Sequence, residues 1–469
     1  MEPEHTNQRP AGETEFVVEK LVYGGDGLGR VDGRVVLVPF TLPGERVRAE
    51  VVKRKPSFEV ARTVEILRAS AARVAPRCPH FGVCGGCTLQ HADPALQVAA
   101  KQRTLEDALA RIGRVRAEAL LPPIAGPAWG YRHRARLAVR DVPKKGGVLI
   151  GFHERKSSYV ADMRECHVIP PAISRLLVPL RGLVESLSIR TRLPQIELAI
   201  GERLAPTAPA AADAGAIASP PDRERPVYAL VLRILEPLST TDEAKLVAFA
   251  DLHRVEFWLQ PGGPDTVAPF HPPNAALAYT LPEFDVALPF APTDFTQVNS
   301  AINRVLVRRA VQLLAPIPGE RVGDFFCGLG NFSLPIARRG ARVVGIEGSK
   351  ALVARAKANA ARNGLAARAT FVVANLFTAT PEAVAAFGTL DRALIDPPRE
   401  GAIELVKSLP HRDDERALAR IVYVSCNPAT LARDAAVLVH EREYRLAAAG
   451  VVNMFPHTAH VESIAVFDR

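Results

Sequence analysis

The chain has 469 residues, too many for one ordinary core, and a typical domain size of about 150 residues predicts roughly three folding units. A hydrophobic fraction of 48% with 23% charged residues is ordinary for a protein with sizeable cores and excludes a largely disordered chain. No apolar run approaches the ~18 residues of a membrane span, and the chain begins with a polar segment, so we expect a cytoplasmic protein without a membrane partner.

The net charge of +9 favours a polyanionic partner such as a nucleic acid. The charge is concentrated, because residues 101–164 hold 14 Lys and Arg against 6 Asp and Glu, a local net charge of +8. A basic face that is merely solvated has the same composition. Charge alone therefore leaves both interpretations open.

The first part of the chain has the pattern of a small β-barrel. Residues 1–15 are polar and are expected to form a disordered tail, and short strands with alternating apolar residues follow between Phe16 and Ile66. Turns between these strands are provided by glycines at positions 24, 25, 27, 29 and 33. An RNA-binding barrel of the OB type and a β-rich appendage without a binding role fit this pattern equally well.

A cysteine-rich segment follows the barrel. Cys78, Cys84 and Cys87 fall within ten residues, and Cys166 lies far along the chain. In a chain without a secretion signal, such cysteines indicate a metal or cluster site rather than disulfides. Four thiolates can hold tetrahedral zinc or a [4Fe–4S] cluster. The five-residue and two-residue spacings differ from zinc-ribbon CxxC pairs and from CxxxCxxC, which favours a structural iron–sulfur cluster.

The central part is expected to be an α+β domain over residues 69–290. Apolar residues at helical spacing predict an amphipathic helix from Pro94 to Arg111, with Gly113 as its C-terminal stop. Strand-like stretches such as RARLAVRD follow this helix. Residues 204–226 are rich in Ala, Pro, Asp and Ser without periodicity, which predicts a disordered insertion.

From residue 291 to 469, buried strands alternate with helices, which indicates a doubly wound, mostly parallel sheet. Ligands bind such sheets beyond the carboxyl ends of the strands. The segment DFFCGLGN ends one strand with a glycine loop, and Glu347 ends the next strand at the spacing of a carboxylate that binds ribose hydroxyls. The glycine loop and the strand-terminal carboxylate occur in both nicotinamide-binding and S-adenosylmethionine-binding proteins. Asn375 and the sequence Asp396-Pro397-Pro398 end the following strands and favour a methyltransferase over a dehydrogenase.

Cys426 is the candidate nucleophile. It ends the apolar strand IVYVSC before Asn427-Pro428, which places its sulfur at the ligand edge of the sheet. A thiolate suits addition to uracil C6, which activates C5 for methylation, whereas a buried structural cysteine is the plain alternative. A base must later remove the C5 proton. Glu462 is our candidate, and His457 and His460 are alternatives.

Several motifs together resemble the bacterial 23S rRNA (uracil-5)-methyltransferase family, in order and almost from end to end. After the glycine-rich barrel they are CPHFGVCGGCTLQH, RECHVI, FTQVN, DFFCGLGNFSLP, IDPPREG, SCNPATLARD and HTAHVES. The resemblance implies a multidomain α/β protein: a TRAM barrel at 16–68, a central domain with a [4Fe–4S] cluster on Cys78, Cys84, Cys87 and Cys166, and a Rossmann-like S-adenosylmethionine domain at 291–469. It also implies that the helix near 94–113 packs against the catalytic domain.

The resemblance assigns roles within the site. It makes Cys426 the nucleophile and Glu462 the base, places Phe295 near the extruded uracil, and gives Cys327 no catalytic role. The S-adenosylmethionine contacts that it implies are Gln297, Phe326, Asn331, Glu347, Asn375 and Asp396. The expected product is 5-methyluridine in 23S rRNA, formed by a monomer that extrudes the base from its stack.

Three other functions remain open at this point. A tRNA uracil-5-methyltransferase would use the same chemistry, although the barrel and the four cysteines argue against that relative. An iron–sulfur redox enzyme would need an electron-transfer partner. A non-catalytic RNA-binding scaffold would have no use for a nucleophile, a base and cofactor acids together.

Overall fold

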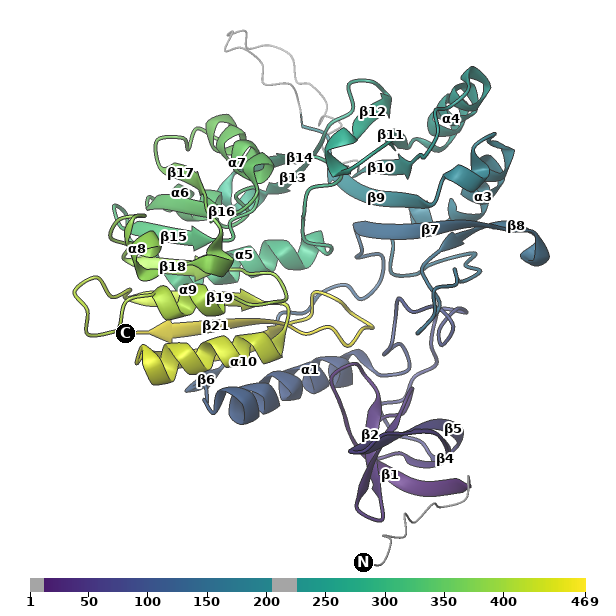
Figure 1. The fold of residues 1–469 in the computed structure, drawn as a ribbon, viewed down its shortest axis with the longest axis horizontal. Helices are drawn as coiled ribbons and strands as arrows, with labels where there is room; N and C mark the ends of the chain where they lie inside the picture. The colour runs from purple at the N-terminus through teal and green to yellow at the C-terminus, as the bar shows by residue number, and fades with distance from the viewer. Residues whose placement is uncertain (1–11, 205–225) are drawn as a thin grey trace, which may run out of the picture.

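The computed structural model describes residues 12–204 and 226–469, which fold into three parts (Figure 1). A barrel is followed by a central sheet and then by a larger sheet with helices on both faces. The insertion expected at 204–226 falls on residues outside the described ranges, as does the tail expected at 1–15 up to residue 11. Within the described ranges, no helix combines the length and the apolar character needed to cross a bilayer.

The N-terminal part is a closed five-stranded barrel, as the glycine and strand pattern predicts. Its strands are β1 Glu13–Leu21, β2 Gly27–Val31, β3 Arg34–Val38, β4 Arg46–Arg54 and β5 Phe58–Arg68. Alternate residues such as Phe16 and Val18 point inward, since side chains alternate across a strand. Gly29 leaves room for the Phe16 ring, which would lie 2.3 Å from an added Cβ. The first strand begins at Glu13, before the expected boundary at residue 16.

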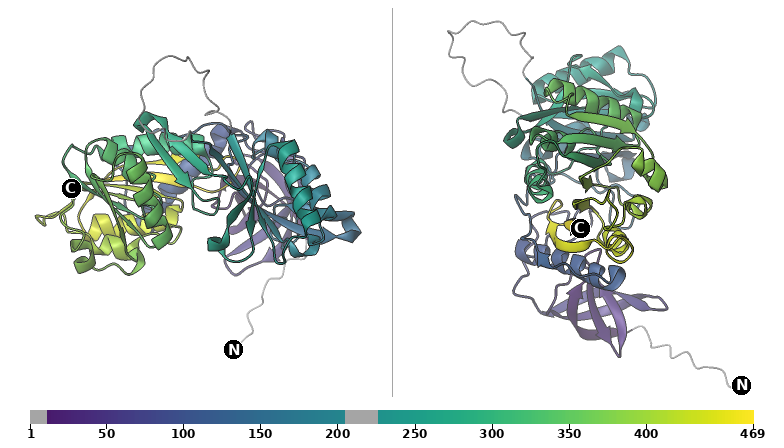
Figure 2. Two further views of the ribbon diagram at one scale, coloured as in Figure 1. Left: turned by 90° about the horizontal axis from the view of Figure 1, so that it is seen from above. Right: turned by 90° about the vertical axis from the view of Figure 1, so that its left-hand side faces the viewer.

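After the cysteine segment the chain crosses to the C-terminal part. Helix α1 Pro94–Ala108 begins with the Asp93 side chain accepting from the Ala95 N–H and continues as the π-helical turn η1 Leu109–Gly113. Leu105 and Leu109 pack in one core with α10 and the C-terminal sheet. The helix therefore lies between that sheet and the barrel, as the views in Figures 1 and 2 agree.

The central sheet has its helices on one face and the C-terminal part on the other. Its strands are β7 Arg134–Val142, β8 Gly147–Gly151, β9 Gln195–Glu202, β10 Pro226–Arg233, β11 Glu256–Gln260, β12 Ala268–His271, β13 Leu277–Leu281 and β14 Val286–Phe290. Its helices are α2 Pro171–Ser174, α3 Leu177–Ser186 and α4 Thr240–His253. In β10, Leu230 and Leu232 face α3 and α4, whereas Ala229 and Val231 face the C-terminal core. That core is continuous across the expected domain boundary at 290/291, because Leu288 packs in one cluster with Leu306.

The C-terminal sheet has the order β17-β16-β15-β18-β19-β21-β20-β6. Its strands are β15 Arg321–Phe325, β16 Arg342–Glu347, β17 Ala369–Val373, β18 Arg392–Ile395, β19 Arg420–Ser425, β20 Arg445–Val452 and β21 Glu462–Asp468, with β6 Ala119–Leu120 added at the edge. Its helices are α5 Ser300–Leu314, α6 Ser333–Arg338, α7 Lys350–Arg362, α8 Pro381–Ala385, α9 Ile403–Ser408 and α10 Pro428–Ala436.

The first five strands of this sheet are parallel, and β21 runs antiparallel between β19 and β20. The sequence predicts the parallel strands and β21, since these are long buried apolar runs. The carboxyl ends of the parallel strands and the start of β21 meet at one edge. The residues that follow those strands are therefore brought together there.

Candidate active site

A pocket opens at the edge of the C-terminal sheet where the parallel strands end. Its wall includes every residue that the sequence assigned to catalysis or to the cofactor: Gln297, Phe326, Asn331, Glu347, Asn375, Asp396, Cys426 and Glu462. Phe295 also lines the pocket and is 72% exposed, which leaves its ring free to meet a ligand at the mouth. One pocket thus contains two thiols, those of Cys327 and Cys426, three carboxyl groups and several aromatic rings.

The glycine loop after β15 forms one side of the pocket. Phe326, Gly328 and Gly330 all have positive φ angles, of 64°, 56° and 99°. This left-handed backbone folds the loop back on β16, where the Glu347 carboxylate accepts from the N–H groups of Gly328 at 3.2 Å and Ser349 at 2.9 Å. These two bonds fix the orientation of the carboxylate that the sequence singled out for ribose hydroxyls.

The Asn331 amide group is hydrogen-bonded to other side chains of the protein through both its oxygen and its nitrogen. Its Oδ1 accepts from the Tyr279 hydroxyl at 2.9 Å and from Asn303 Nδ2 at 3.0 Å, and its Nδ2 donates to Asn303 Oδ1 at 3.1 Å. Both lone pairs of the oxygen are therefore occupied. In this arrangement Asn331 shapes the pocket wall and has one N–H left for a ligand.

Cys426 and Glu462 lie on neighbouring strands. Ser425 of β19 is paired with Ser463 of β21 in the antiparallel register, so the next residue of β19 and the first residue of β21 lie side by side at the pocket edge. Cys426 is half-buried and Glu462 is buried. The register explains why two residues far apart in the sequence face one ligand.

Burial shifts the acid–base properties of this pair. It raises the pKa of the Cys426 thiol to about 11, and the negative charges of Glu462 and Asp396 add to the rise. Burial likewise raises the pKa of Glu462 to about 8, with Asp396 adding to it. The Arg399 guanidinium opposes both shifts.

Arg399 also lines the pocket, although the motif IDPPREG, to which it belongs, did not suggest a role for it. Its place directly after the strand-terminal Asp-Pro-Pro was the signal that could have found it.

A second carboxyl of the pocket wall, that of Asp396, is partly buried. Burial raises the pKa of Asp396 to about 7, and the neighbouring Asp324 contributes to the rise. Asp324 itself is fully buried, bonds the Ser333 hydroxyl, and leaves its Oδ1 without a partner. Burial therefore favours the protonated, neutral form of both carboxyl groups, and ionising either of them costs stability.

The two histidines considered as alternative bases are in different places. His460 lines the pocket, with Nδ1 3.5 Å from Arg399 Nη2. His457 is turned away from it: the ring stacks on Trp129 at 3.8 Å between centroids, and Nδ1 lies 3.2 Å from Gln97 Nε2. Burial lowers the pKa of His457 to about 4. His460 therefore stays an alternative to Glu462 as the base. The contacts of His457 instead hold the loop at 453–461, which joins β20 to β21.

The four cysteines expected to bind a cluster line one small pocket near the barrel. Cys84 and Cys166 are buried, and Cys78 and Cys87 are partly buried. The other walls include the rings of Phe81 and Phe152 and the thioether of Met163. All six cysteines of the chain are free thiols. A mostly apolar pocket lined by four thiols has the ligand types of a soft metal or an iron–sulfur cluster, but no three of the four sulfur atoms lie within 4.8 Å of one another.

Cys327 is buried beside the glycine loop with its Sγ 3.8 Å from the Gly328 carbonyl oxygen. Burial raises the pKa of this thiol well above its usual range. A buried neutral thiol of this kind packs as a small apolar side chain. Nothing in its surroundings calls for a catalytic role.

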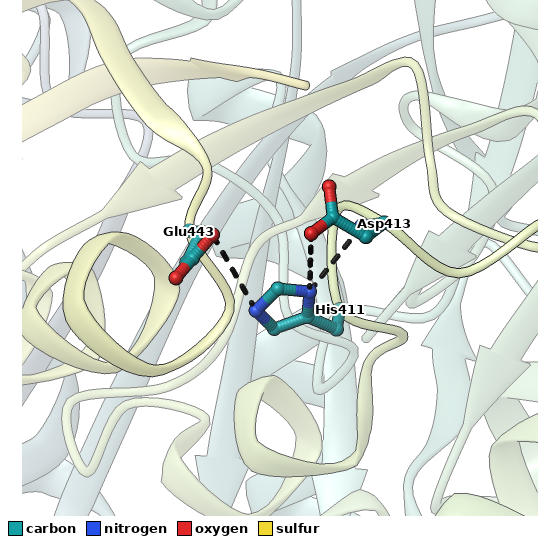
Figure 3. A group of neighbouring side chains, drawn as sticks. All are labelled: His411, Asp413 and Glu443. Atoms are coloured by element: carbon teal, nitrogen blue, oxygen red, sulfur yellow. Dashed lines mark hydrogen bonds and ion pairs between the residues drawn. The ribbon is translucent and has the colours of Figure 1, made fainter.

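One further group has the composition of a metal site. Figure 3 shows His411 between Asp413 and Glu443, with ring nitrogens 3.8 Å and 3.7 Å from their carboxylate oxygens. Asp413 and Glu443 are exposed and precede β19 and β20, at the edge of the sheet opposite the pocket. Exposed ion pairs at such distances are common without a bound ion. We assign this group no part in the site.

Comparison with known proteins identifies close relatives. A family model described as tRNA (Uracil-5-)-methyltransferase matches residues 285–469, and a TRAM domain model matches residues 13–62. A 23S rRNA (uracil(1939)-C(5))-methyltransferase, RlmD, of Aromatoleum aromaticum is 58% identical over 454 residues, which cover 97% of this chain and 99% of the relative. The protein of the same name from Burkholderia pseudomallei is 57% identical and covers 96% and 94%.

A solved structure resembles the chain over nearly its full length. It is the Pyrococcus abyssi tRNA (uracil-54, C5)-methyltransferase in complex with S-adenosyl-L-homocysteine. The TM-score is 0.70 at 25% identity, and the match covers 97% of this chain and 100% of that one. The barrel, the central sheet and the C-terminal sheet thus recur together in that protein.

Proposed function

This chain belongs to the family of 23S rRNA (uracil(1939)-C(5))-methyltransferases, and from that membership we propose how its residues methylate uracil C5. The family expected from the motifs is confirmed, and with it an S-adenosylmethionine-dependent RNA uracil-5-methyltransferase acting on 23S rRNA. The barrel does not exclude the tRNA enzyme considered earlier, because the match to the Pyrococcus abyssi tRNA enzyme covers all of that chain. The identity favours the rRNA enzyme, since it is 25% to that structure and 58% to the Aromatoleum aromaticum relative. The observation that carries the mechanism is the adjacency of Cys426 and Glu462 at one edge of the pocket.

The first chemical step falls to Cys426. Its thiolate forms a bond to C6 of the uracil, and the C5–C6 π electrons shift toward C5 and O4 as an enolate. The half-buried thiol has a pKa of about 11, so its proton must pass to water before the thiolate attacks. The Arg399 guanidinium is the nearby cation that favours the thiolate.

S-adenosylmethionine, when bound, would supply an electrophilic methyl group for the enolate carbon, with its S–CH3 bond broken and S-adenosylhomocysteine as the leaving group. The residues that line its expected position are Gln297, Phe326, Asn331, Glu347, Asn375 and Asp396. Glu347 accepts ribose hydroxyls, as its strand-terminal place indicates. Phe326 and Phe377 offer ring faces on the same side of the pocket, with their centroids 5.6 Å apart.

The last step falls to Glu462. Its carboxylate removes the proton from C5, the C5–C6 double bond forms again, and the Cys426 thiolate leaves C6. A pKa near 8 suits this task, because a base works best when its pKa is close to the working pH. His460 is a second candidate on its position in the pocket.

The target base must leave its stack to reach Cys426, and Phe295 is placed to contact it at the mouth of the pocket. We assign the grip on the RNA backbone to the barrel and to the exposed basic side chains of the stretch at 101–164, which has a net charge of +8. The buried Lys101 is not among them. The affinity for RNA is then expected to fall steeply as salt rises.

The four-thiol pocket is proposed to hold a structural [4Fe–4S] cluster on Cys78, Cys84, Cys87 and Cys166. Support comes from the presence of the four cysteines in the lining of one mostly apolar pocket. Such a group would tie segments together and takes no part in methyl transfer. Iron and sulfide analysis of anaerobically purified protein tests this assignment, and one zinc per chain would reject it.

The activity itself is tested by mapping 5-methyluridine in 23S rRNA by mass spectrometry from cells with and without the gene. We expect one 5-methyluridine to disappear on deletion and to return with the wild-type gene. An unchanged modification map would refute the proposed function.

A further inference from the structure

The loop that joins β20 to β21 leads into the active site but is held from outside the C-terminal part. It spans residues 453–461, contributes Phe455 and His460 to the pocket, and ends at Glu462. In Figure 1 this yellow loop leaves the sheet toward the segments that precede the central sheet. Its partners come from the cysteine segment, from α1, from Tyr131 and from Asn299.

Lys101 on α1 is a main contact of the loop. Its Nζ donates to Asn453 Oδ1 at 2.7 Å and to the Phe455 carbonyl oxygen at 2.8 Å. The residue is 2% exposed, and burial lowers its pKa to about 7. A buried amine is costly unless its hydrogen bonds are satisfied, so these two acceptors and Lys101 hold each other in place.

Gln97, one helical turn before Lys101, holds the next part of the loop. Its Oε1 accepts from the His457 N–H at 2.8 Å, and its Nε2 donates to the carbonyl oxygens of Leu89 at 3.1 Å and Ala92 at 2.9 Å. His457 has a φ of +64°, which an L-residue rarely adopts. A strained backbone of this kind persists only when surrounding contacts fix it.

The cysteine segment also binds the loop through hydrogen bonds. The N–H groups of Thr88 and Leu89, directly after Cys87, both donate to the His457 carbonyl oxygen at 2.9 Å. The Ala459 N–H donates to Thr88 Oγ1 at 3.1 Å. The N–H group and the carbonyl oxygen of His457 are therefore both hydrogen-bonded to residues that precede position 98.

We propose that Lys101 and Gln97 are positioning residues for the reaction, which hold the loop at 453–461 so that Glu462 faces the pocket beside Cys426. Neither side chain lines the pocket, so each acts through the loop. The catalytic consequence rests on the proposed role of Glu462 as base. The structural consequence, an ordered loop, does not depend on that role.

The test compares Lys101→Met with Arg103→Met in the full chain. Both remove a positive charge from α1, but Arg103 is 68% exposed and pairs with Asp107 on the same helix. In native-state hydrogen exchange, Lys101→Met is expected to lower the protection of peptides covering 453–461 at least tenfold and to leave the rest of the C-terminal sheet unchanged. Arg103→Met is expected to leave both unchanged.

Kinetics provide the second measurement. With Lys101→Met we expect kcat to fall at least tenfold, KM for S-adenosylmethionine to stay within twofold, and the covalent RNA adduct to accumulate, because removal of the C5 proton slows. Lys101→Arg keeps donors at this position and is expected to restore part of the rate. If Lys101→Met does not fold, Gln97→Met provides the same comparison without a change of charge.

Unchanged loop protection, protection lost evenly across the domain, or a normal kcat despite a loosened loop would each overturn the proposal. Glu462→Gln separates this failure from failure of the proposed function. If that variant forms no adduct, the base is wrongly assigned, whereas the exchange data still decide whether Lys101 orders the loop.

Discussion

At the scale of single residues, the proposed mechanism gives the two halves of the reaction to Cys426, directly after β19, and Glu462, the first residue of β21. Cys426→Ala removes the nucleophile, so we expect turnover to fall by more than ~10³-fold while S-adenosylmethionine affinity stays within about twofold. Glu462→Gln blocks the last step, so a covalent RNA adduct should accumulate. Methyl transfer to rRNA, calorimetry and a denaturing gel measure these three quantities.

These two variants serve as controls for each other. Adding Cys426→Ala to Glu462→Gln should abolish the retarded band, because the adduct needs the thiol. Full turnover by Cys426→Ala, or a band that persists in the double variant, would contradict the mechanism.

The buried Glu462 carboxyl also predicts how stability changes with pH. Its pKa in the folded chain is about 8, above the 4.5 of an unburied glutamate, so the folded state binds more protons between these values. The contribution of the protonated carboxyl to the free energy of unfolding is fully present below about pH 4.5 and is lost as pH rises through about 8. Glu462→Gln removes this loss, so it should stabilise the protein more at pH 9 than at pH 6, by a difference on the order of a few kcal/mol.

Thermal unfolding of both proteins at the two pH values provides the measurement. The variant keeps the size of the side chain, which limits changes in packing. A stability difference that does not vary with pH would show that the carboxyl is not held protonated in the fold.

At the scale of elements, two glycine substitutions test the contact between α10 and η1, the π-helical turn that follows α1. Gly113 lies in this contact, and Gly182 in α3 is the control. A Cβ on Gly113 would lie 2.5 Å from the Ala432 carbonyl oxygen, a backbone atom that cannot easily move away. Gly113→Ala is therefore expected to cost about 1–3 kcal/mol of stability. Gly182 in α3 has nothing within 4 Å of the added atom, so Gly182→Ala should stabilise by up to about 1 kcal/mol.

Chemical denaturation of the two variants measures both signs. Because each substitution adds one methyl group to a helical segment, the pair separates close packing from helix propensity. Equal effects of the two changes would mean that η1 and α10 are not in the contact seen here.

The elements that could be predicted from the sequence are those with strong periodic patterns. The barrel strands alternate, and the parallel strands of the C-terminal sheet are apolar runs that end in Glu347, Asn375 or Asp396. Strand β20 escaped prediction because RLAAAGVV is rich in Ala and Gly, which have low strand propensity, and its pairing with β21 and β6 fixes it instead.

The contacts of the site likewise divide into those that a sequence pattern predicts and those that it does not. The places of Gln297, Phe326 and Asn331 were expected from the family resemblance alone. Residue type and strand position predicted which strand-terminal side chains meet in the pocket, because the sheet topology dictates it. They could not predict that Asn331 bonds Asn303 and Tyr279, or that His457 points away from the pocket toward Gln97. Those contacts join segments distant in sequence, and no local pattern encodes them.

At the scale of the whole molecule, the four-thiol pocket lies where the three parts meet. On one side, Arg155 bonds Asp26 of the barrel at 2.6 Å and lies over the Phe40 ring, and its own N–H bonds the Val83 carbonyl oxygen between the cysteines. On the other side, Thr88 bonds the loop that leads to Glu462. A cluster in this pocket would therefore stabilise both junctions at once.

Removal of the proposed cluster tests this arrangement. Chelation under oxidising conditions, or Cys87→Ala, should lower the melting temperature by several degrees and reduce the hydrogen-exchange protection of the cysteine segment, of residues 22–26 and of 453–461 together, because all three lose a common support. Cys426→Ala, which lies outside the pocket, should keep its iron and its protection. If the metal-free protein keeps all three segments protected, the four thiols have no part in joining the barrel to the active site.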